Sequence, residues 1–265
     1  MHPDPHDVAS PSPDASASGQ SLAALFRSHA TELAPALLGC HLEVRTAEGA
    51  VLVRLTEVEA YGNHGEDPGA HSFRGRTRRN ASLFGPPQHT YVYLNYGIHR
   101  CLNLACDDEG TAGGVLLRAA EVVEGRDLAV ARRGGKDTGA KLLSGPGRLG
   151  QGLGITLGDD AQPILLNGRG RAEQAAPRGA AGGTCAGTAS EPEEPAALPA
   201  VPAVFTLHPP EVRDEMQVRS GPRVGVSGPG GHAEYSWRFW LDGDPSVSPY
   251  RAAKPRKSPR TRPSP

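Results

Sequence analysis

Residues 55–103 decide the fold of this chain and read LTEVEAYGNHGEDPGAHSFRGRTRRNASLFGPPQHTYVYLNYGIHRCLN. Apolar and polar residues alternate up to the acids Glu57 and Glu59, which is typical of a β-strand that runs out of a core. A segment rich in Gly, Asn, Asp, Pro and Arg follows over residues 62–89 and predicts a long loop. Alternating residues on either side of residues 96–98 then predict a β-hairpin with a glycine in its turn.

The rest of the chain predicts further helices and strands by the same rules. Residues 21–38 predict one or two short helices, with Thr31 as an N-cap and Gly39 as the stop. Strands are expected at 41–46, 50–61, 90–95, 99–105, 115–119, 203–208, 223–227 and 236–241, and helices at 124–133 and within 144–155. This order lacks βαβ alternation, so it predicts an α+β fold with a mainly antiparallel sheet in a single mixed domain.

Two carboxylates lie two residues apart on the strand expected at residues 50–61. Period two predicts one shared face for the apolar residues and the acids, formed by Val51, Val53, Leu55, Glu57, Glu59 and Tyr61. Acids at this spacing lie about 7 Å apart, close to the carboxyl separation in inverting glycosidases. One of them could activate a water molecule as a general base, whereas many acids on strands are simply solvated.

Four of the six tyrosines of the chain fall within residues 55–103. Tyrosines at period two, such as Tyr91 and Tyr93, are commonly core residues. Beside acids they can also be the flat faces that hold a base flipped out of a duplex. An apolar or aromatic hairpin tip is a means of unstacking a base step from the minor groove.

Two segments that contain arginine are candidates for phosphate contacts. The run RGRTRR at residues 74–79 is either a solvated loop or a set of phosphate contacts. The run SGPGR at residues 144–148 could present backbone N–H groups and Arg148 to a phosphate. It lacks the length and the lysine of a P-loop, which excludes nucleotide hydrolysis.

Three segments have compositions that bury too little apolar surface to fold, and we expect them to be disordered. They are an N-terminal tail at residues 1–20, a low-complexity insert at residues 168–200 and a basic tail at residues 251–265. About 200 residues remain between residues 21 and 250, which is enough for one domain with a sizeable core.

The net charge of −1 depends on the last fifteen residues, which contribute six positive charges and no acid. The rest of the chain therefore sums to −7. Affinity for DNA usually comes from phosphate contacts and counterion release. A DNA-binding body of this charge needs its arginines gathered on one face, or it needs the basic tail to supply the attraction.

The cysteines are few, which favours reduced thiols in a cytosolic protein over a disulfide scaffold; they are Cys40, Cys101, Cys106 and Cys185. The spacing between Cys101 and Cys106 fits no standard zinc knuckle, so we expect no metal. The N-terminus lacks the charged and apolar regions of a secretory signal, and no apolar run approaches the roughly 20 residues of a membrane span. We therefore expect a cytoplasmic protein.

Together these motifs resemble the alkyladenine (3-methyladenine) DNA glycosylase family of the single-domain type. The shared motifs are TEVEAY, DPGAH, RTRRN, YVYLNYGIHRCLN, VLLRA, SGPGRL, RVGVS and WRF, and they occur in the family's order. They span residues 21–250 apart from the insert. The resemblance implies a mixed domain around a curved antiparallel β-sheet, with the hairpin projecting into the minor groove. It also implies a monofunctional enzyme that uses no metal and no cofactor.

The resemblance further implies which residues perform the reaction and open the duplex. Glu59 would deprotonate the attacking water, and Arg118 would help to position that water. Tyr96 would be the wedge that fills the space left by the flipped base. Gly97 and Ile98 would contact DNA beside it at the hairpin tip.

A second group of residues is implied as the pocket for the flipped purine. Tyr61, His71 and Tyr93 would stack on the base and hydrogen-bond it. Asn103 would discriminate against the exocyclic amino group of guanine.

The expected function is the removal of alkylated or deaminated purines, of the 3-methyladenine, 7-methylguanine or hypoxanthine type, from double-stranded DNA. Hydrolysis of the N-glycosidic bond by the activated water would start base excision repair. We expect a monomer that associates with the nucleoid when bound to DNA. Two alternatives stay open: a nucleoside or glycoside hydrolase that uses both acids, and a non-catalytic minor-groove DNA-binding protein.

Overall fold

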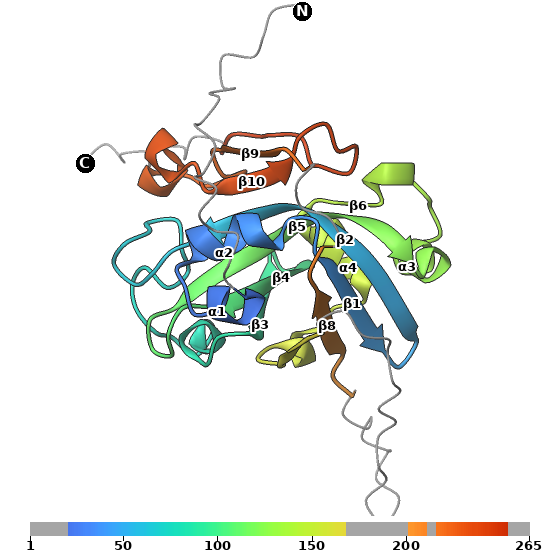
Figure 1. Ribbon diagram of the computed structural model, residues 1–265, viewed down its shortest axis with the longest axis horizontal. Helices are drawn as coiled ribbons and strands as arrows, with labels where there is room; N and C mark the ends of the chain where they lie inside the picture. Colours follow the sequence, from blue (N-terminus) through green and yellow to red (C-terminus); the bar gives the residue numbers. More distant parts are fainter. Residues whose placement is uncertain (1–20, 168–200, 211–215, 254–265) are drawn as a thin grey trace, which may run out of the picture.

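The computed structural model describes residues 21–167, 201–210 and 216–253. In this part of the chain the strands form one curled sheet with helices packed against it (Figure 1). The main path of the sheet is β3 (His89–Asn95), β4 (His99–Cys106), β5 (Gly113–Glu124), β2 (Gly49–Tyr61), β1 (His41–Thr46), β8 (Val204–His208) and β7 (Ile164–Leu166). The expected α+β fold with a curved sheet and a β-hairpin is therefore confirmed. The tails and the insert that we expected to be disordered lie outside the described residues, apart from residues 251–253.

Further strands branch from this path, and we call the C-terminal ones with their connections, residues 216–253, the C-terminal layer. β10 (Arg238–Leu241) pairs with β2 and with β9 (Val218–Gly221), and β6 (Leu143–Ser144) pairs with β5. Figure 1 shows β9 and β10 above the long strands β2 and β5. Among the described strands only the pairing of β7 with β8 is parallel. The C-terminal layer thus covers the part of the sheet where β2 ends.

The helices are short and flank the sheet. They are α1 (Leu22–Leu25), α2 (Ala30–Leu37), α3 (Arg126–Arg132) and α4 (Pro146–Leu153), with 3-10 turns η2 (Ala81–Phe84), η3 (Gly139–Lys141), η4 (Leu157–Asp159), η5 (Pro229–Gly231) and η6 (Ala233–Tyr235). Thr31 is not the N-cap of α2, because the ring nitrogen of His29 accepts the Thr31 N–H at 3.3 Å instead. Gly39 follows the helix with a φ of +78°, so the expected stop is confirmed.

The prediction of a strand at residues 223–227 is wrong. The segment is irregular, and the strand that pairs with β10 lies earlier, at Val218–Gly221. Pro222 has no N–H to donate to a ladder, and Gly225 adopts a left-handed φ of +72°. These two residues end the strand and turn the chain toward the end of β2.

A β-bulge in β2 determines which face of the sheet the two acids occupy. The register with β5 slips between Leu55 and Val58. Leu55 lies in the main hydrophobic core before the bulge, and Val58 and Ala60 lie in it after the bulge. Glu57 and Glu59 therefore belong to the opposite face, which the C-terminal layer covers. The expected shared face of apolar residues and acids is wrong, because an extra residue inverts the alternation.

α4 packs directly on the backbone of β4, close to the hairpin tip. A Cβ atom at Gly150 would overlap the carbonyl oxygen of Arg100, and one at Gly147 would overlap the ring of His99. Only glycine permits this approach. The helix therefore supports one strand of the hairpin without intervening side chains.

Replacing Gly150 by alanine is expected to lower the free energy of unfolding by about 1–3 kcal/mol, the usual cost of overpacking. The added methyl group would push α4 away from β4. Urea or thermal denaturation measures the loss. Gly158→Ala is the matched control, because its Cβ would meet only the Thr156 hydroxyl at 3.4 Å on an exposed turn. Equal stability of the two variants would contradict the close approach.

Candidate active site

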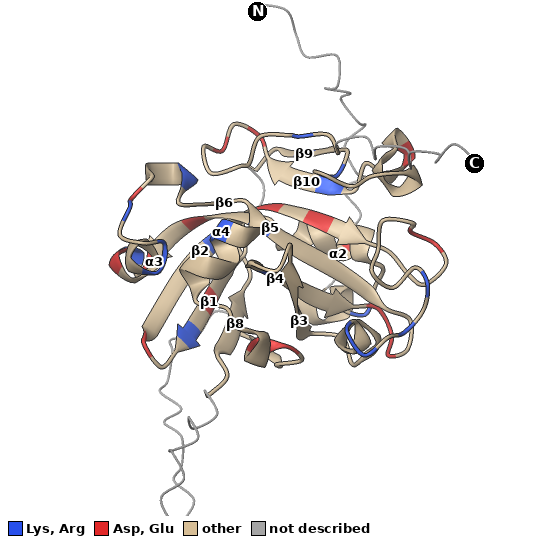
Figure 2. Cartoon of the chain, turned by 180° about the vertical axis from the view of Figure 1, so that it is seen from behind, with Lys and Arg blue, Asp and Glu red and all other residues tan. Residues whose placement is uncertain are grey.

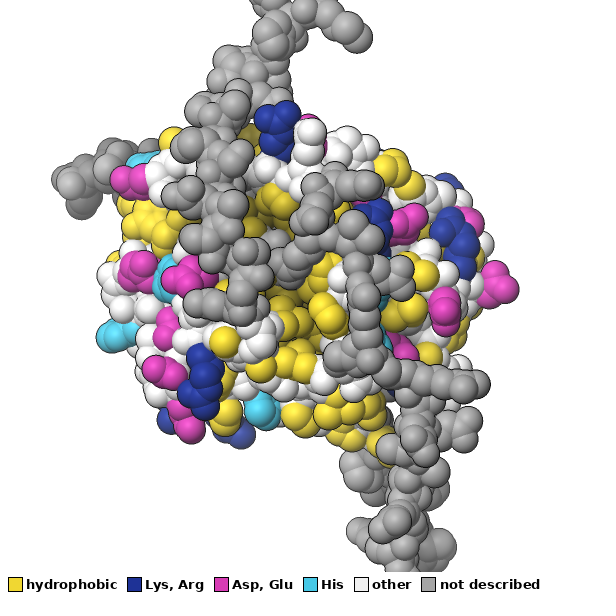
Figure 3. Space-filling model, viewed as in Figure 1, with side chains coloured by type: hydrophobic (Ala, Val, Ile, Leu, Met, Phe, Trp, Pro, Cys, Tyr) yellow, Lys and Arg dark blue, Asp and Glu magenta, His cyan; other side chains and the backbone are white. Residues whose placement is uncertain are grey.

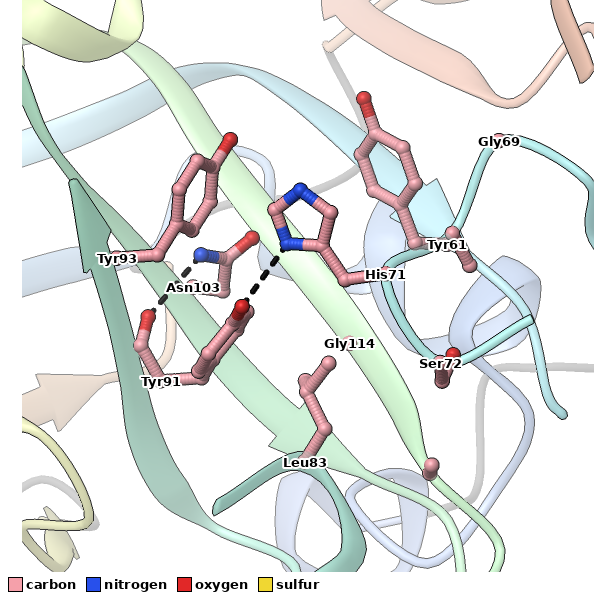
Figure 4. A pocket seen from close by; sticks show the side chains of 11 residues that line it. Tyr61, Gly69, His71, Ser72, Leu83, Tyr91, Tyr93, Asn103 and Gly114 are labelled. Atoms are coloured by element: carbon pink, nitrogen blue, oxygen red, sulfur yellow. Dashed lines mark hydrogen bonds between the residues drawn. The ribbon is translucent and has the colours of Figure 1, made fainter. Parts of the chain in front are cut away.

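A pocket lies between the end of β2, the loop that follows it and the β3–β4 hairpin (Figure 4). Aromatic, polar and small residues line it: Tyr61, Gly69, Ala70, His71, Ser72, Leu83, Tyr91, Tyr93, Asn103, Ala112 and Gly114. A small second core cluster formed by Leu83, Tyr91 and Ala112 supports the base of the pocket. The structure thus brings together all four residues that the sequence predicted for base binding, from four separate segments.

Three aromatic rings form one side of the pocket. Tyr91 and Tyr93 stack with centroids 5.6 Å apart, and His71 meets Tyr93 edge-on at 4.6 Å. The His71 Nδ1 atom lies 2.9 Å from the Tyr91 hydroxyl. Figure 4 shows Tyr61 on the other side of His71 from Tyr93. The pocket is thus lined by several aromatic rings together with polar atoms, which suits a flat heterocycle.

Asn103 is oriented by the backbone of the neighbouring strand. Its Nδ2 donates to the carbonyl oxygen of Tyr91 at 3.0 Å, so Oδ1 points the other way, into the pocket (Figure 4). The side chain is almost fully buried. The pocket therefore presents a fixed hydrogen-bond acceptor at this position.

Glu59 lies beside the pocket and reaches it through Tyr61. It has no exposed surface. Its Oε2 accepts hydrogen bonds from the Tyr61 hydroxyl at 2.9 Å and from Arg118 Nη1 at 3.3 Å, and its Oε1 accepts one from Val224 N–H at 2.6 Å. Every neighbour is a donor, which is the environment of an ionised carboxylate.

Glu57 is the centre of a buried ion cluster behind Glu59. Its Oε1 accepts from Arg118 Nε at 2.9 Å and from Arg238 Nε at 2.8 Å, and Ser248 donates through both its N–H and its hydroxyl. Burial disfavours the ionised form of Glu57, but the two arginines and Ser248 outweigh burial and lower its pKa. Glu57 is thus saturated with donors and holds Arg118 in place.

The electrostatic setting of His71 favours its neutral form. Partial burial of the ring and the nearby charge of Arg79 both lower the pKa of His71. The Arg79 guanidinium lies 5.8 Å from the centroid of the Tyr93 ring. Burial also raises the pKa values of Tyr91 and Tyr93, so both hydroxyls stay protonated.

The hairpin tip is exposed and has an unusual backbone. Tyr96 is 87% exposed and Ile98 is 68% exposed, although both are large and hydrophobic. Tyr96 and Gly97 adopt left-handed φ angles of +50° and +72°, and Ile98 N–H closes the turn on the Asn95 carbonyl at 3.1 Å. Positive φ at both central residues is the geometry of a primed β-turn, which matches the twist of the two strands. The tip therefore presents an aromatic side chain to solvent in a fixed geometry.

Basic residues lie on both sides of the hairpin. Figure 2 shows them on the loop beside β3 and around α3 and α4. Arg148 is exposed on the first turn of α4, where it donates to the Lys141 carbonyl at 3.3 Å. On the face seen in Figure 3, by contrast, acidic and basic side chains are interspersed around a hydrophobic centre. Attraction to a phosphate backbone is thus better supplied beside the hairpin than on that face.

Sequence reasoning missed four buried polar residues that hold the acids and Tyr61 in place from behind the pocket. They are Asp67, Arg223, Arg238 and Ser248. The arginines stand in the motifs RVGVS and WRF, so their presence was visible in the sequence. Their ionic partners lie 156 and 181 residues away, and no local pattern reveals such a pairing.

Comparisons with known proteins assign the family. A model of the family described as methylpurine-DNA glycosylase (MPG) matches residues 24–181, which is more than half of the chain.

The chain belongs to the methylpurine-DNA glycosylase family.

Relatives of this DNA glycosylase match it over most of its length. A protein of Leifsonia xyli subsp. xyli is 42% identical over 231 residues, which cover 85% of this chain and 90% of the relative. A Streptomyces avermitilis protein is 42% identical over 226 residues, covering 85% and 89%, and a Corynebacterium efficiens protein is 42% identical over 231 residues, covering 87% and 96%. All three are provisionally named 3-methyladenine DNA glycosylase. The expected family and enzyme class, a hydrolase of N-glycosyl bonds, are confirmed.

Two further observations concern metals and membranes. Within residues 21–167, 201–210 and 216–253, no group of three or more His, Cys, Asp or Glu side chains is placed to hold a metal ion. Cys40, Cys101 and Cys106 are buried and form no disulfide among the described residues, and Cys185 lies outside them. In the same part of the chain no helix has the length and apolar character needed to cross a membrane.

We expect the His71 ring of this glycosylase to be neutral at pH 7, with a pKa below the usual value of about 6.5. Burial is the larger cause and Arg79 the smaller. Arg79→Gln should therefore raise the pKa of His71, and an NMR titration of labelled histidine measures the midpoint. Arg76→Gln is the control, since it removes the same charge from the same loop. An unchanged midpoint in Arg79→Gln would refute the electrostatic assignment.

Proposed function

We propose that this glycosylase flips alkylated or deaminated purines out of double-stranded DNA and hydrolyses the N-glycosidic bond with a water activated by Glu59. The observation that carries the proposal is the juxtaposition of an aromatic pocket with a buried carboxylate that accepts three hydrogen bonds. Tyr61 belongs to both, because it lines the pocket and its hydroxyl donates to Glu59. The names of the relatives support 3-methyladenine as one substrate.

The pocket selects for a damaged base by its charge. Alkylation at N3 or N7 makes a purine cationic and weakens its bond to the sugar. The faces of Tyr61 and Tyr93 would attract such a base by about 0.5–2 kcal/mol each. A neutral His71 adds no repulsion. An undamaged purine gains less from these contacts and keeps the stronger bond to its sugar.

The reaction needs one water and one proton acceptor. Three donors approach Glu59, and a carboxylate has about four lone-pair positions, so one position remains for water. Glu59 takes a proton from the water as the water oxygen bonds to the sugar carbon. The N-glycosidic bond breaks, and its electron pair leaves with the purine. Arg118 is held by Glu57 and Glu59, and it orients Glu59 and the water toward the sugar carbon.

The exposed residues open the duplex in this proposal. Tyr96 fills the space that the flipped nucleotide leaves, with Gly97 and Ile98 against the minor groove. Arg148 contacts a phosphate beside the hairpin. Asn103 disfavours undamaged guanine through its exocyclic amino group, and the weaker sugar bond of cationic 7-methylguanine offsets that cost. The enzyme acts as a monomer on the nucleoid, in the cytoplasm, since one chain supplies the whole site.

Two rival functions account for less of the structure. A hydrolase of free nucleosides would use the acids but would have no use for the exposed hairpin tip that carries Tyr96. A non-catalytic minor-groove protein would use the tip but would leave the burial of Glu59 unexplained. Base release from duplexes that each carry one lesion, compared with free nucleosides and undamaged duplex, separates the three.

Glu59→Gln should lower the single-turnover rate of base release by about 10²–10⁴-fold, the usual contribution of a general base. Binding of lesion-bearing duplex should persist, because the amide keeps the shape of the side chain. Glu121→Gln is the control, since Glu121 is a half-exposed acid of the same sheet that pairs with Arg54. Wild-type excision by Glu59→Gln would exclude Glu59 as the base.

We also expect the enzyme to leave an intact abasic strand and to form no covalent adduct with DNA. Strand nicking by a bifunctional glycosylase requires an amine nucleophile. The four lysines of the chain are Lys136, Lys141, Lys254 and Lys257, and none falls within residues 55–103. Borohydride treatment during turnover tests this, with a known bifunctional glycosylase as the positive control. A trapped protein–DNA adduct would overturn the monofunctional assignment.

A further inference from the structure

A buried guanidinium lies against the ring of Tyr61. The side chain of Arg223 has no exposed surface, and its central carbon lies 4.5 Å from the Tyr61 ring centroid. The rings of Trp237 and Tyr235 enclose the same guanidinium at 5.4 Å and 5.6 Å. Arg223 is not among the described residues that line the pocket, whereas Tyr61 is. Tyr61 therefore stands between the pocket and a fixed cation.

Arg223 also ties three segments of the chain together. Its two terminal nitrogens donate to both carboxylate oxygens of Asp67 at 2.5 Å and 2.7 Å, and this ion pair has no exposed surface. They donate in addition to the carbonyl oxygens of Ala60 at 3.0 Å and Gly230 at 2.7 Å. The end of β2, the loop after it and the C-terminal layer thus meet at one side chain.

Asp67 extends this connection to the wall of the pocket. Its carboxylate accepts the N–H groups of Gly62 at 3.1 Å and of Gly69 at 2.8 Å. Gly69 lines the pocket, and a Cβ atom there would meet Arg223 at 2.6 Å. The loop that carries His71 therefore begins on the Arg223–Asp67 pair.

The residue after Arg223 reaches the acid. The Val224 N–H donates to Glu59 at 2.6 Å, while the Arg223 side chain stacks on Tyr61. Two neighbouring residues of one irregular segment thus contact the acid and the tyrosine that donates to it. A displacement of this segment would move both.

We propose that Arg223 is a positioning residue for base excision, which fixes the plane of Tyr61 and, through the adjoining N–H group of Val224, the orientation of Glu59. This inference rests on the proposed function. The pairing with Asp67 also matters electrostatically, because the ion pair places no net charge behind Tyr61. The pocket face of the ring thus keeps its attraction for a cationic purine.

The first test is Arg223→Lys, which keeps the charge and loses the planar fork that binds Asp67 at two points. Single-turnover excision of 7-methylguanine should fall by about 10–100-fold, as expected for a misplaced reacting geometry. Binding of a duplex with an abasic-site analogue should stay unchanged, because no base then contacts Tyr61. Arg219→Lys is the matched control, since Arg219 lies four residues earlier in a half-exposed ion pair with Asp242. Wild-type excision by Arg223→Lys would overturn the inference.

A second variant keeps the inference testable if Arg223→Lys does not fold. Asp67→Asn retains most of the hydrogen-bonding shape but leaves a net positive charge behind Tyr61. Excision of cationic 7-methylguanine should then fall about tenfold more than excision of neutral hypoxanthine, because a buried charge is weakly screened. A purely structural role predicts an equal loss on both lesions, and that result would overturn the inference. A wild-type enzyme that releases neither base would instead overturn the proposed function.

Discussion

The site depends on the sharing of one arginine by two buried carboxylates. Glu57 and Glu59 have no exposed surface, and two unpaired anions in such a place would each cost several kcal/mol. Arg118 donates to both, at 2.9 Å and 3.3 Å, and Arg238 supplies a second cation to Glu57. The two cations thus balance the two anions. Donors occupy both oxygens of Glu57, whereas Glu59 also bonds the pocket residue Tyr61. Glu59 is therefore the acid on the pocket side of the cluster.

The β-bulge and the C-terminal layer make this cluster possible together. The bulge turns the acids away from the main core and toward Arg118, which donates to both of them. β10 and the segment after it then cover that face and bring Arg238 and Ser248 to Glu57. The layer also carries Arg223 and Val224 to Tyr61 and Glu59. The last third of the chain is therefore part of the site, although residues 55–103 supply most of the pocket lining.

Local patterns predicted most of the fold because they depend on near neighbours. Period-two alternation located the strands around residues 41–61 and 90–105, and the glycine at the tip located the hairpin. The bulge was not predictable, since the sequence around Leu55 continues to alternate while only the pairing with β5 shifts. The strand expected at residues 223–227 failed for a similar reason. Its alternation is real, but Pro222 and the left-handed Gly225 prevent it from continuing the strand that pairs with β10.

The pocket residues were predictable as a set, but their mutual geometry was not. The resemblance to the glycosylase family predicted Tyr61, Tyr93 and Tyr96. The structure places the last two on the same hairpin. Tyr93 in the wall and Tyr96 at the tip are three residues apart on one hairpin, about 10 Å by strand geometry. α4 packs on the backbone of β4 in this hairpin, so wall and tip share one supported element. Within the proposed function, a wedge that enters the duplex therefore brings the pocket to the base that it displaces.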